Sequence, residues 1–374
     1  QTEFSIMRLL HGESVLQPIN PNNYQEQLDE KLNQLKSKFS GLTIPEIDIY
    51  TSEPLHYRMR AEFRIWHEGG QAHYGMNKPG EKRPYIIDDF PIGSELINHL
   101  MPKLLEAINA SEALSRRLFS AEFLTTLSGE ALITLIYHKP LDDEWKHVAQ
   151  KLQLQLGTPI IGRSRKQKLV LDRDFVIEEL QVAGETYKYQ QVETGFTQPN
   201  AGVNQQMLSW AVEHSAECNG DLLELYCGNG NFTCALAQNF DRVLATEISK
   251  ISVRSAEYNF AANNIDNVTI VRMSSEEFTQ ALNGVRPFRR LKEIDLTSYN
   301  FSTIFVDPPR AGLDDATVEL VKRFENILYI SCNPETLKNN LDSICETHTI
   351  EHFAIFDQFP YTHHLESGVL LKKI

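Results

Sequence analysis

The chain has 374 residues, of which 41% are hydrophobic and 23% are charged, and its formal net charge is −14. The composition is that of an ordinary globular protein, and the length exceeds a single hydrophobic core, so we expect two domains. No apolar run is long enough to cross a membrane, and the acidic balance excludes a general attraction to polyanions. A nucleic-acid partner would need a local basic surface. The basic runs at 162–168 and 286–292 are weak candidates, because such runs are usually just solvated.

Cysteine usage and the N-terminal sequence indicate the compartment. The cysteines are odd in number, widely spaced and form no C-x-x-C pair: Cys218, Cys227, Cys234, Cys332 and Cys345. This pattern argues for a reducing compartment and against a disulfide framework, a zinc site or an iron–sulfur cluster. The adjacent His363 and His364 lack metal-ligand spacing, so we expect no metal. No secretory leader is recognisable, and we expect a cytoplasmic protein without a membrane partner.

Residues 1–50 are interpreted as an N-terminal extension. Residues 1–20 have no clear period, and part of this segment is expected to be disordered or foreign to the natural protein. A helix is predicted over 24–39, because Leu28, Leu32 and Leu35 recur at three- and four-residue spacing among charged side chains.

Residues 51–195 predict an α+β domain with a mostly antiparallel sheet. Residues 57–66 alternate Arg or Glu with apolar side chains, which is typical of a half-buried strand, and a Gly-Gly turn follows. Further strands and helices are expected at 71–74, 95–107, 123–137, 141–156 and 187–196.

The first strand of this domain carries a candidate RNA-binding face. It displays Arg58, Arg60 and Arg64 beside Trp66. Single-stranded RNA binds to such faces by charge and by stacking, but an ordinary solvated face explains the pattern equally well. Arg64 is the best single candidate for an RNA contact, and Phe119 is a further candidate for stacking on unpaired bases.

Residues 196–374 predict a catalytic domain in which strands alternate with helices. Strands are expected at 221–226, 242–247, 268–273, 303–306, 327–331, 351–356 and 368–372. Helices are expected at 232–238, 253–263 and 316–324. This succession predicts a Rossmann-like, doubly wound α/β fold with a mostly parallel sheet and an antiparallel edge at the C-terminus.

The first strand of this domain runs into a turn that suits a nucleotide-like cofactor. Gly228 and Gly230 permit positive φ and let a ligand approach the backbone. Glu247 ends the next strand, about twenty residues on, where an acid binds a ribose diol. There is no third glycine at the dinucleotide position, which favours S-adenosylmethionine over a dinucleotide.

Two later strands are followed by side chains that are candidates for a role in the reaction. Asp307 follows a buried strand and precedes two prolines that fix the backbone. Cys332 follows another buried strand and precedes Asn333 and Pro334, which favour the start of a helix. We expect the helix N-terminus to stabilise a Cys332 thiolate, although a lone cysteine at a strand end is more often packing.

Several motifs together resemble the RNA 5-methyluridine methyltransferase family. They are FTQPN at 196–200, LYCGNGNF at 225–232, DPPRAGL at 307–313, SCNPET at 331–336 and FPYTHHLE at 359–366. Within the family, the chain is most similar to the bacterial enzymes that methylate a uridine in the tRNA T-loop. Ribosomal RNA members usually carry an iron–sulfur cluster, and the N-terminal half of this chain has no cysteine.

The resemblance implies a set of functional residues and a mechanism. The implied cofactor contacts are Gln198, Tyr226, Asn231, Glu247 and Asp307, with no metal or iron–sulfur cluster. Cys332 is the implied nucleophile, which adds to C6 of uracil so that C5 can take the methyl group, and Glu366 is the implied base. The implied partner is the T-arm of tRNA, or another RNA with a T-loop-like hairpin, with no obligate protein partner.

Two alternatives remain open from the sequence. An exocyclic-amine methyltransferase uses a similar acidic-Pro-Pro turn, but it ends that turn with an aromatic residue where this chain has Arg310, and it needs no cysteine. A chaperone that opens tRNA loops is the second alternative, and that role can coexist with methylation.

Overall fold

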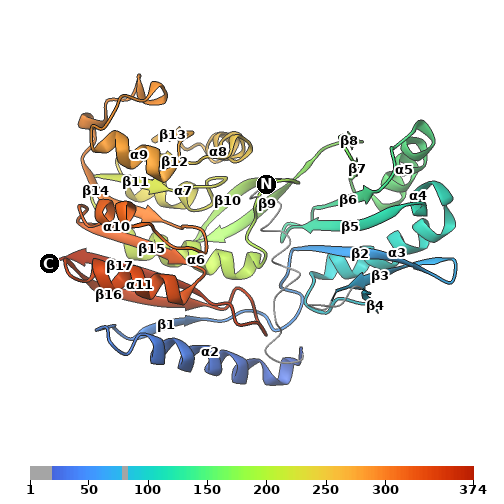
Figure 1. The fold of residues 1–374 in the computed structure, drawn as a ribbon, viewed down its shortest axis with the longest axis horizontal. Coiled ribbons are helices and arrows are strands. Elements are labelled where there is room, and N and C mark those ends of the chain that lie inside the picture. The colour runs from blue at the N-terminus through green and yellow to red at the C-terminus, as the bar shows by residue number, and fades with distance from the viewer. Residues whose placement is uncertain (1–18, 78–82) are drawn as a thin grey trace.

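The computed structural model describes residues 19–77 and 83–374, so the expectation for residues 1–20 falls almost wholly outside the described residues. Figure 1 shows two lobes, each built on its own large sheet, with the ribbon of β9 and β10 between them. No helix among the described residues is long and apolar enough to cross a membrane.

One lobe contains the predicted catalytic residues Cys332 and Glu366, and we call it the catalytic lobe. Its eight-stranded sheet has the order β1-β16-β17-β15-β14-β11-β12-β13. The strands are β1 (Ile47–Tyr50), β11 (Asp221–Leu225), β12 (Val243–Thr246), β13 (Val268–Val271), β14 (Phe301–Val306), β15 (Asn326–Ser331), β16 (His348–Phe356) and β17 (Glu366–Lys373). The strands from β11 to β15 are all parallel, which confirms the predicted Rossmann-like α/β fold.

One detail of the predicted topology is wrong. The antiparallel strand β17 does not lie at the edge but between β15 and β16, and the edge strand is β1, which pairs parallel to β16. Residues 366–371 of β17 are all buried. A strand buried on both faces gains most when its backbone is paired on both sides as well, and β1 then takes the exposed edge.

Helices cover both faces of this sheet, as a doubly wound fold requires. They are α2 (Tyr24–Lys38), α6 (Ala201–Ser215), α7 (Asn231–Leu236), α8 (Lys250–Ala262), α9 (Ser275–Leu282), α10 (Asp315–Val321) and α11 (Pro334–Ile344). One core includes Trp210 of α6 and Phe232 of α7, and the other includes Leu28 and Leu35 of α2. The predicted N-terminal helix therefore packs into the catalytic core.

The second lobe contains a seven-stranded sheet in the order β4-β3-β2-β5-β6-β7-β8. The strands are β2 (Arg60–Glu68), β3 (Gln71–Met76), β4 (Tyr85–Ile87), β5 (Leu118–Thr125), β6 (Ala131–Tyr137), β7 (Ile160–Ser164) and β8 (Gln167–Val170), and only the β6–β7 pair is parallel. The helices α3 (Glu95–Ala110), α4 (Glu112–Ser115) and α5 (Asp143–Leu156) contribute to its core. The mostly antiparallel arrangement is as predicted.

β7, β8 and β9 are not predicted, because polar residues and, in β7, a glycine interrupt the apolar pattern. Gly162 in β7 is required by packing, since a Cβ there would collide with the Trp145 ring.

β9 (Phe175–Val182) and β10 (Glu185–Val192) form a two-stranded ribbon. Glu178 of β9 accepts hydrogen bonds from the backbone of Leu127 and Ser128 in the second lobe. The backbone of Lys188 in β10 exchanges two hydrogen bonds with the side-chain amide of Asn263, the residue that follows α8 in the catalytic lobe. The ribbon is thus anchored to both lobes.

Candidate active site

Three ionisable side chains meet at one edge of the catalytic sheet. Cys332 follows β15, Asp307 follows the neighbouring β14, and Glu366 begins β17 on the other side of β15. Because the register pairs Ser331 with Ser367, the next residues at this end of the two strands are Cys332 and Glu366. Glu366 is only 5% exposed, whereas Cys332 and Asp307 are partly exposed. The edge therefore presents a thiol and a carboxylate to a common space.

The surroundings of Cys332 match the prediction in structure but not in charge. Asn333 caps α11 by accepting a hydrogen bond from the backbone of Glu335, and Pro334 is the first helical residue. The pKa of the Cys332 thiol is nevertheless raised to about 12, because of its burial and the nearby carboxylates of Glu366 and Asp307. The expectation that the helix N-terminus holds a thiolate is wrong for this state, since burial and two acids outweigh a partial charge.

The two carboxyl groups also resist ionisation. Burial raises the pKa of Asp307 to about 7. Burial, and secondarily the charge of Asp307, hold the pKa of Glu366 well above its usual range. Cys332, Asp307 and Glu366 would each carry a negative charge when ionised, and they cannot all ionise in one buried site. The site therefore favours the binding of a positively charged group.

Arg310 is a functional candidate that the sequence argument did not assign. Its charge is the main influence that lowers the pKa of the Cys332 thiol. The Arg310 carbonyl accepts hydrogen bonds from the Asn333 amide (3.1 Å) and the Thr336 hydroxyl (3.2 Å) at the start of α11. The signal available in the sequence was a basic residue directly after a rigid Pro-Pro turn.

The Gly-containing turn after β11 forms a cradle. The backbone N–H of Gly228 donates to Glu247 (3.0 Å), whose other oxygen accepts from the backbone of Ser249 (2.7 Å). A Cβ on Gly228 would meet nothing within 4 Å, so this position faces open space, as a ligand cradle requires. Gly230 has a φ of 79°, as predicted, and a Cβ there would meet Phe260 of α8 at 2.9 Å, so both backbone conformation and packing require glycine at this position.

The other predicted cofactor contacts are held by partners from elsewhere in the fold. Tyr226 adopts a positive φ of 61° and donates its hydroxyl to Ser275 (2.8 Å). Asn231 exchanges two amide hydrogen bonds with Asn204 of α6. Gln198 accepts from Gln358 (2.7 Å), which follows the end of β16. The Oε1 atom of Gln358 is buried without a partner, as expected of a site that awaits a polar ligand.

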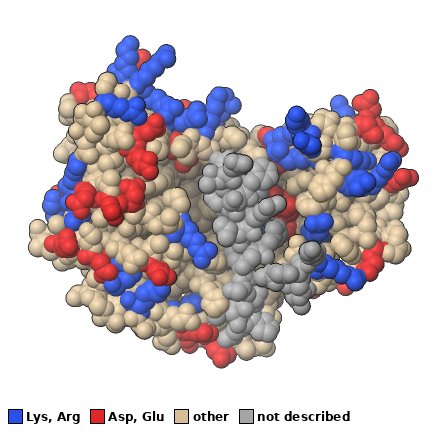
Figure 2. Space-filling model, viewed as in Figure 1, with Lys and Arg blue, Asp and Glu red and all other residues tan. Residues whose placement is uncertain are grey.

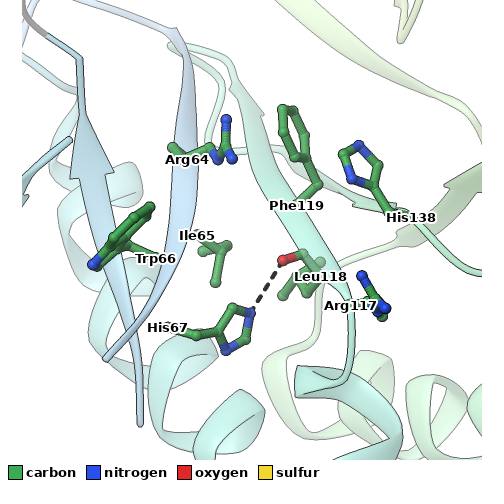
Figure 3. Close-up of a pocket in the computed structure, with 8 residues that line it drawn as sticks. All are labelled: Arg64, Ile65, Trp66, His67, Arg117, Leu118, Phe119 and His138. Atoms are coloured by element: carbon green, nitrogen blue, oxygen red, sulfur yellow. Dashed lines mark hydrogen bonds between the residues drawn. The ribbon is translucent and has the colours of Figure 1, made fainter. Parts of the chain in front are cut away.

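The second lobe carries the predicted RNA residues in a pocket of about 230 Å³ (Figure 3). The Arg64 guanidinium lies 4.1 Å from the centre of the Phe119 ring, and His138 stacks on Phe119 with a centroid distance of 4.3 Å. Figure 3 shows Phe119 between the other two side chains, so a base would stack most readily on an outer face of this trio. His138 had no signal in the sequence, because β6 brings it beside Phe119 only in the folded sheet.

The remaining arginines of the predicted RNA face are structural. Arg58 and Arg60 are buried rather than displayed. Arg60 pairs with the buried Glu122 (2.5 Å), and it also donates to backbone carbonyls at Glu193 and Gly195 of the segment after β10. A buried carboxylate needs a cation, which explains why Arg60 faces inwards.

The two basic runs have different surroundings. In the first, Arg163 and Lys168 both pair with Glu193, which consumes much of their charge. In the second, Arg290 lies 3.4 Å from Glu277, and Arg286 covers the Phe288 ring. Figure 2 shows Lys and Arg gathered over the connection between α9 and β14, far from the pocket of the second lobe. Among the described residues, no group of three or more His, Cys, Asp or Glu is placed to hold a metal.

The Rossmann-like sheet, the glycine cradle and the acid that follows β12 together form an arrangement suited to a cofactor that contains a ribose. The fold is shared with the tRNA (uracil-54, C5)-methyltransferase of Pyrococcus abyssi, solved with S-adenosyl-L-homocysteine, with a TM-score of 0.72 at 21% identity over 93% of this chain and 83% of that one.

Sequence comparison identifies the family. The family model described as tRNA (uracil-5-)-methyltransferase matches residues 23–374, and the chain belongs to that family. It is 63% identical to the tRNA/tmRNA (uracil-C(5))-methyltransferase of Cellvibrio japonicus over 94% of this chain and 96% of the relative. It is 60% identical to the enzyme of that name from Saccharophagus degradans over 95% of this chain and 98% of the relative.

Proposed function

We propose that this enzyme transfers a methyl group from S-adenosylmethionine to C5 of a uridine in the T-loop of tRNA, through a covalent bond between Cys332 and C6. The observation that carries the proposal is the meeting of Cys332 and Glu366 at the ends of β15 and β17, on the sheet edge that also holds the cradle. The exocyclic-amine alternative explains neither group, and the family is one of uracil-5-methyltransferases.

Five residues around the sheet edge are proposed to hold the cofactor: Gln198, Tyr226, Asn231, Glu247 and Asp307. Glu247 has both carboxylate oxygens anchored by backbone N–H groups, and each oxygen keeps a lone pair that can accept from a ribose hydroxyl. Gln198 accepts through its oxygen and keeps its own amide N–H groups for a ligand carboxylate. S-adenosylmethionine supplies an electrophilic methyl group on a positively charged sulfur.

The Cys332 sulfur is proposed to begin and end the reaction. Once it has lost its proton, which Arg310 favours electrostatically, the thiolate adds to C6 and moves electron density onto C5. After C5 carries the methyl group, Glu366 takes the remaining C5 proton. The electrons of that C–H bond restore the C5–C6 double bond, and the bond from C6 to sulfur breaks. The raised pKa of Glu366 makes its ionised carboxylate a stronger proton acceptor, so this step requires that Glu366 has lost its own proton beforehand.

The pocket of Arg64, Phe119 and His138 is proposed to receive unpaired bases of the T-arm while the target uridine is turned out towards Cys332. The same contacts suit a T-loop-like hairpin in another RNA, such as the tmRNA in the names of the relatives. Because this pocket lies on a separate sheet from the thiol, RNA binding can persist without methylation. That separation supports the proposal of an added role in opening and refolding tRNA, and a tRNA substrate supports the proposal of a cytoplasmic location.

The proposal is tested by mapping methyl groups in tRNA treated with the enzyme and isotope-labelled cofactor. We expect one labelled uridine in the T-loop, and no label in a transcript whose T-loop uridine is replaced by cytidine. A tRNA containing 5-fluorouridine should form a protein–RNA adduct that survives a denaturing gel, because fluorine cannot leave as a cation. Normal methylation without any adduct on that tRNA would disprove covalent catalysis.

A further inference from the structure

The N-terminal helix α2 reaches into the connection between β16 and β17 through buried polar contacts. Lys31 and Asp357 form an ion pair of 2.7 Å, and their side chains are only 2% and 0% exposed. Lys31 also donates to the carbonyl of Phe359 (2.8 Å). One turn earlier, Gln27 donates to the other oxygen of Asp357 (2.7 Å) and accepts from the backbone N–H of Tyr361 (3.0 Å). A single face of one helix turn thus binds the connection from Asp357 to Tyr361.

This connection leads directly to Glu366. Asp357 follows the last residue of β16, and that residue, Phe356, is paired with Glu366 across the two strands. Other hydrogen bonds hold the same connection from β1 and the segment after it: the Asp357 N–H donates to the carbonyl of Tyr50, the last residue of β1, and the Tyr361 hydroxyl donates to the carbonyl of Pro54. The position of the Glu366 carboxylate therefore depends on a connection that the N-terminal part of the chain fixes at several points.

A purely stabilising helix would be expected to bury apolar side chains alone. The residues that α2 buries are Gln27, Leu28, Lys31 and Leu35. The two leucines pack into the apolar core with Leu341 and Phe353, as any covering helix does. The two polar residues instead form hydrogen bonds with the connection, which requires the removal of a lysine and an aspartate from water. Such buried pairs favour one geometry over others rather than simply adding stability.

We propose that Lys31 and Gln27 are positioning residues, which hold the β16–β17 connection so that Glu366 lies where it can take the C5 proton. This inference rests on the proposed function, because it concerns the base of that reaction. By positioning Glu366, α2 supports the last step of the cycle, in which the C5 proton passes to Glu366 and the sulfur of Cys332 leaves C6. Methyl transfer itself precedes that step and does not require the carboxylate to be aligned.

The test uses the full-length enzyme with Lys31→Met, which keeps the length of the side chain and removes its charge. We expect single-turnover methyl transfer close to that of the wild type, but release of the RNA slowed by roughly 10- to 100-fold, which is the scale for a catalytic group misplaced by about 1 Å. The share of enzyme in a methylated protein–RNA adduct during turnover should rise accordingly on a denaturing gel. An adduct share equal to that of the wild type would overturn the inference.

Leu35→Ala is the matched control, because it weakens the same helix without removing any of the hydrogen bonds from α2 to the connection. Leu35→Ala should lower the thermal midpoint while leaving the adduct share unchanged. If the adduct share rises equally in Leu35→Ala and Lys31→Met, α2 only stabilises the fold and the inference is overturned. If Lys31→Met fails to fold, Gln27→Met keeps the ion pair and removes two of the hydrogen bonds, and it should produce a smaller rise.

The Glu366→Gln variant separates this inference from the proposed function. If that variant traps no adduct, the assignment of the base is wrong and the positioning role falls with it. If Glu366→Gln traps the adduct while Lys31→Met and Gln27→Met do not, only the role of α2 is wrong.

Discussion

The two sheets of this molecule present function in different ways. β15 is buried along its whole length, with helices on both faces of its sheet, whereas β2 alternates buried and partly exposed residues. A strand covered on both faces can offer chemistry only where it ends, and Cys332 lies immediately after such an end. A strand with one open face can offer side chains along its length, as β2 does with Arg64. The catalytic lobe is therefore expected to control rate and cofactor affinity, and the second lobe RNA affinity.

Removal of the nucleophile is the largest expected effect. Cys332→Ala should abolish adduct formation and reduce methylation by about 10⁴-fold or more, since no other group can add to C6. Its affinity for tRNA in a filter-binding assay should change little, because that affinity is assigned to the other lobe. Cys345→Ala, which removes the other partly exposed thiol, is the control and should retain activity. Methylation that persists in Cys332→Ala would refute the mechanism.

Removal of the base should give a different failure from removal of the nucleophile. Glu366→Gln keeps the thiol and can still pass the methyl group to C5, but it releases the RNA about 10²- to 10⁴-fold more slowly, the usual contribution of a general base. Denaturing gels should show a stable adduct that carries labelled methyl. Glu351→Gln on the neighbouring strand β16 makes the same change at an exposed position and should behave as wild type.

Loss of the acid at the end of β12 should affect the cofactor alone. Glu247→Ala is expected to cost about 1.5–3 kcal/mol of binding free energy for S-adenosylmethionine, the range for hydrogen bonds to a charged group. Calorimetry measures this directly, with the exposed Glu257→Ala of α8 as a charge-matched control. Equal affinities in the two variants would remove Glu247 from the cofactor site.

Changes in the second lobe should weaken RNA binding and its dependence on salt. Arg64→Ala should flatten the plot of log affinity against log salt concentration by about one phosphate contact, while leaving cofactor affinity intact. Lys103→Ala on α3 removes the same charge outside the pocket, and its salt dependence should match that of the wild type. If Arg64→Ala instead slows single-turnover methylation at saturating RNA, the second lobe affects the rate of reaction, and its assignment to RNA affinity alone is wrong.

The smallest effect concerns the protonation of the thiol. Asp307→Asn removes one of the two negative charges that raise the pKa of Cys332, so the pH midpoint for alkylation of this thiol should fall by about one pH unit. Arg310→Met should move the midpoint in the opposite direction, because it removes the charge that favours the thiolate. Alkylation at Cys332 is followed by peptide mass spectrometry, and a midpoint unmoved in both variants would show that these charges do not reach the sulfur.

The two sheets also differ in what the sequence could predict. The apolar run of β15 followed by Asn333 and Pro334 predicts that Cys332 lies between a strand end and a helix start, because both are local properties of the sequence. That Cys332 and Glu366 are neighbours depends on β17 inserting between β15 and β16, which is a long-range pairing without a local signal. In the second lobe, alternation predicts β2 but not which of its side chains are buried by other segments. The prediction that Arg58 and Arg60 are displayed on the surface is therefore wrong. The raised pKa of Cys332 required knowing which acids surround it.

The protonated state of Cys332 has a consequence for the lifetime of the protein. Peroxides attack thiolates and largely spare thiols, and the later products of that oxidation are irreversible. A sulfur whose pKa is raised to about 12 is almost entirely thiol at neutral pH, so it should withstand peroxide between catalytic cycles. The carboxylates that surround it would then act as a safeguard, leaving the sulfur open to oxidation chiefly during the moments when it is ready to react with RNA.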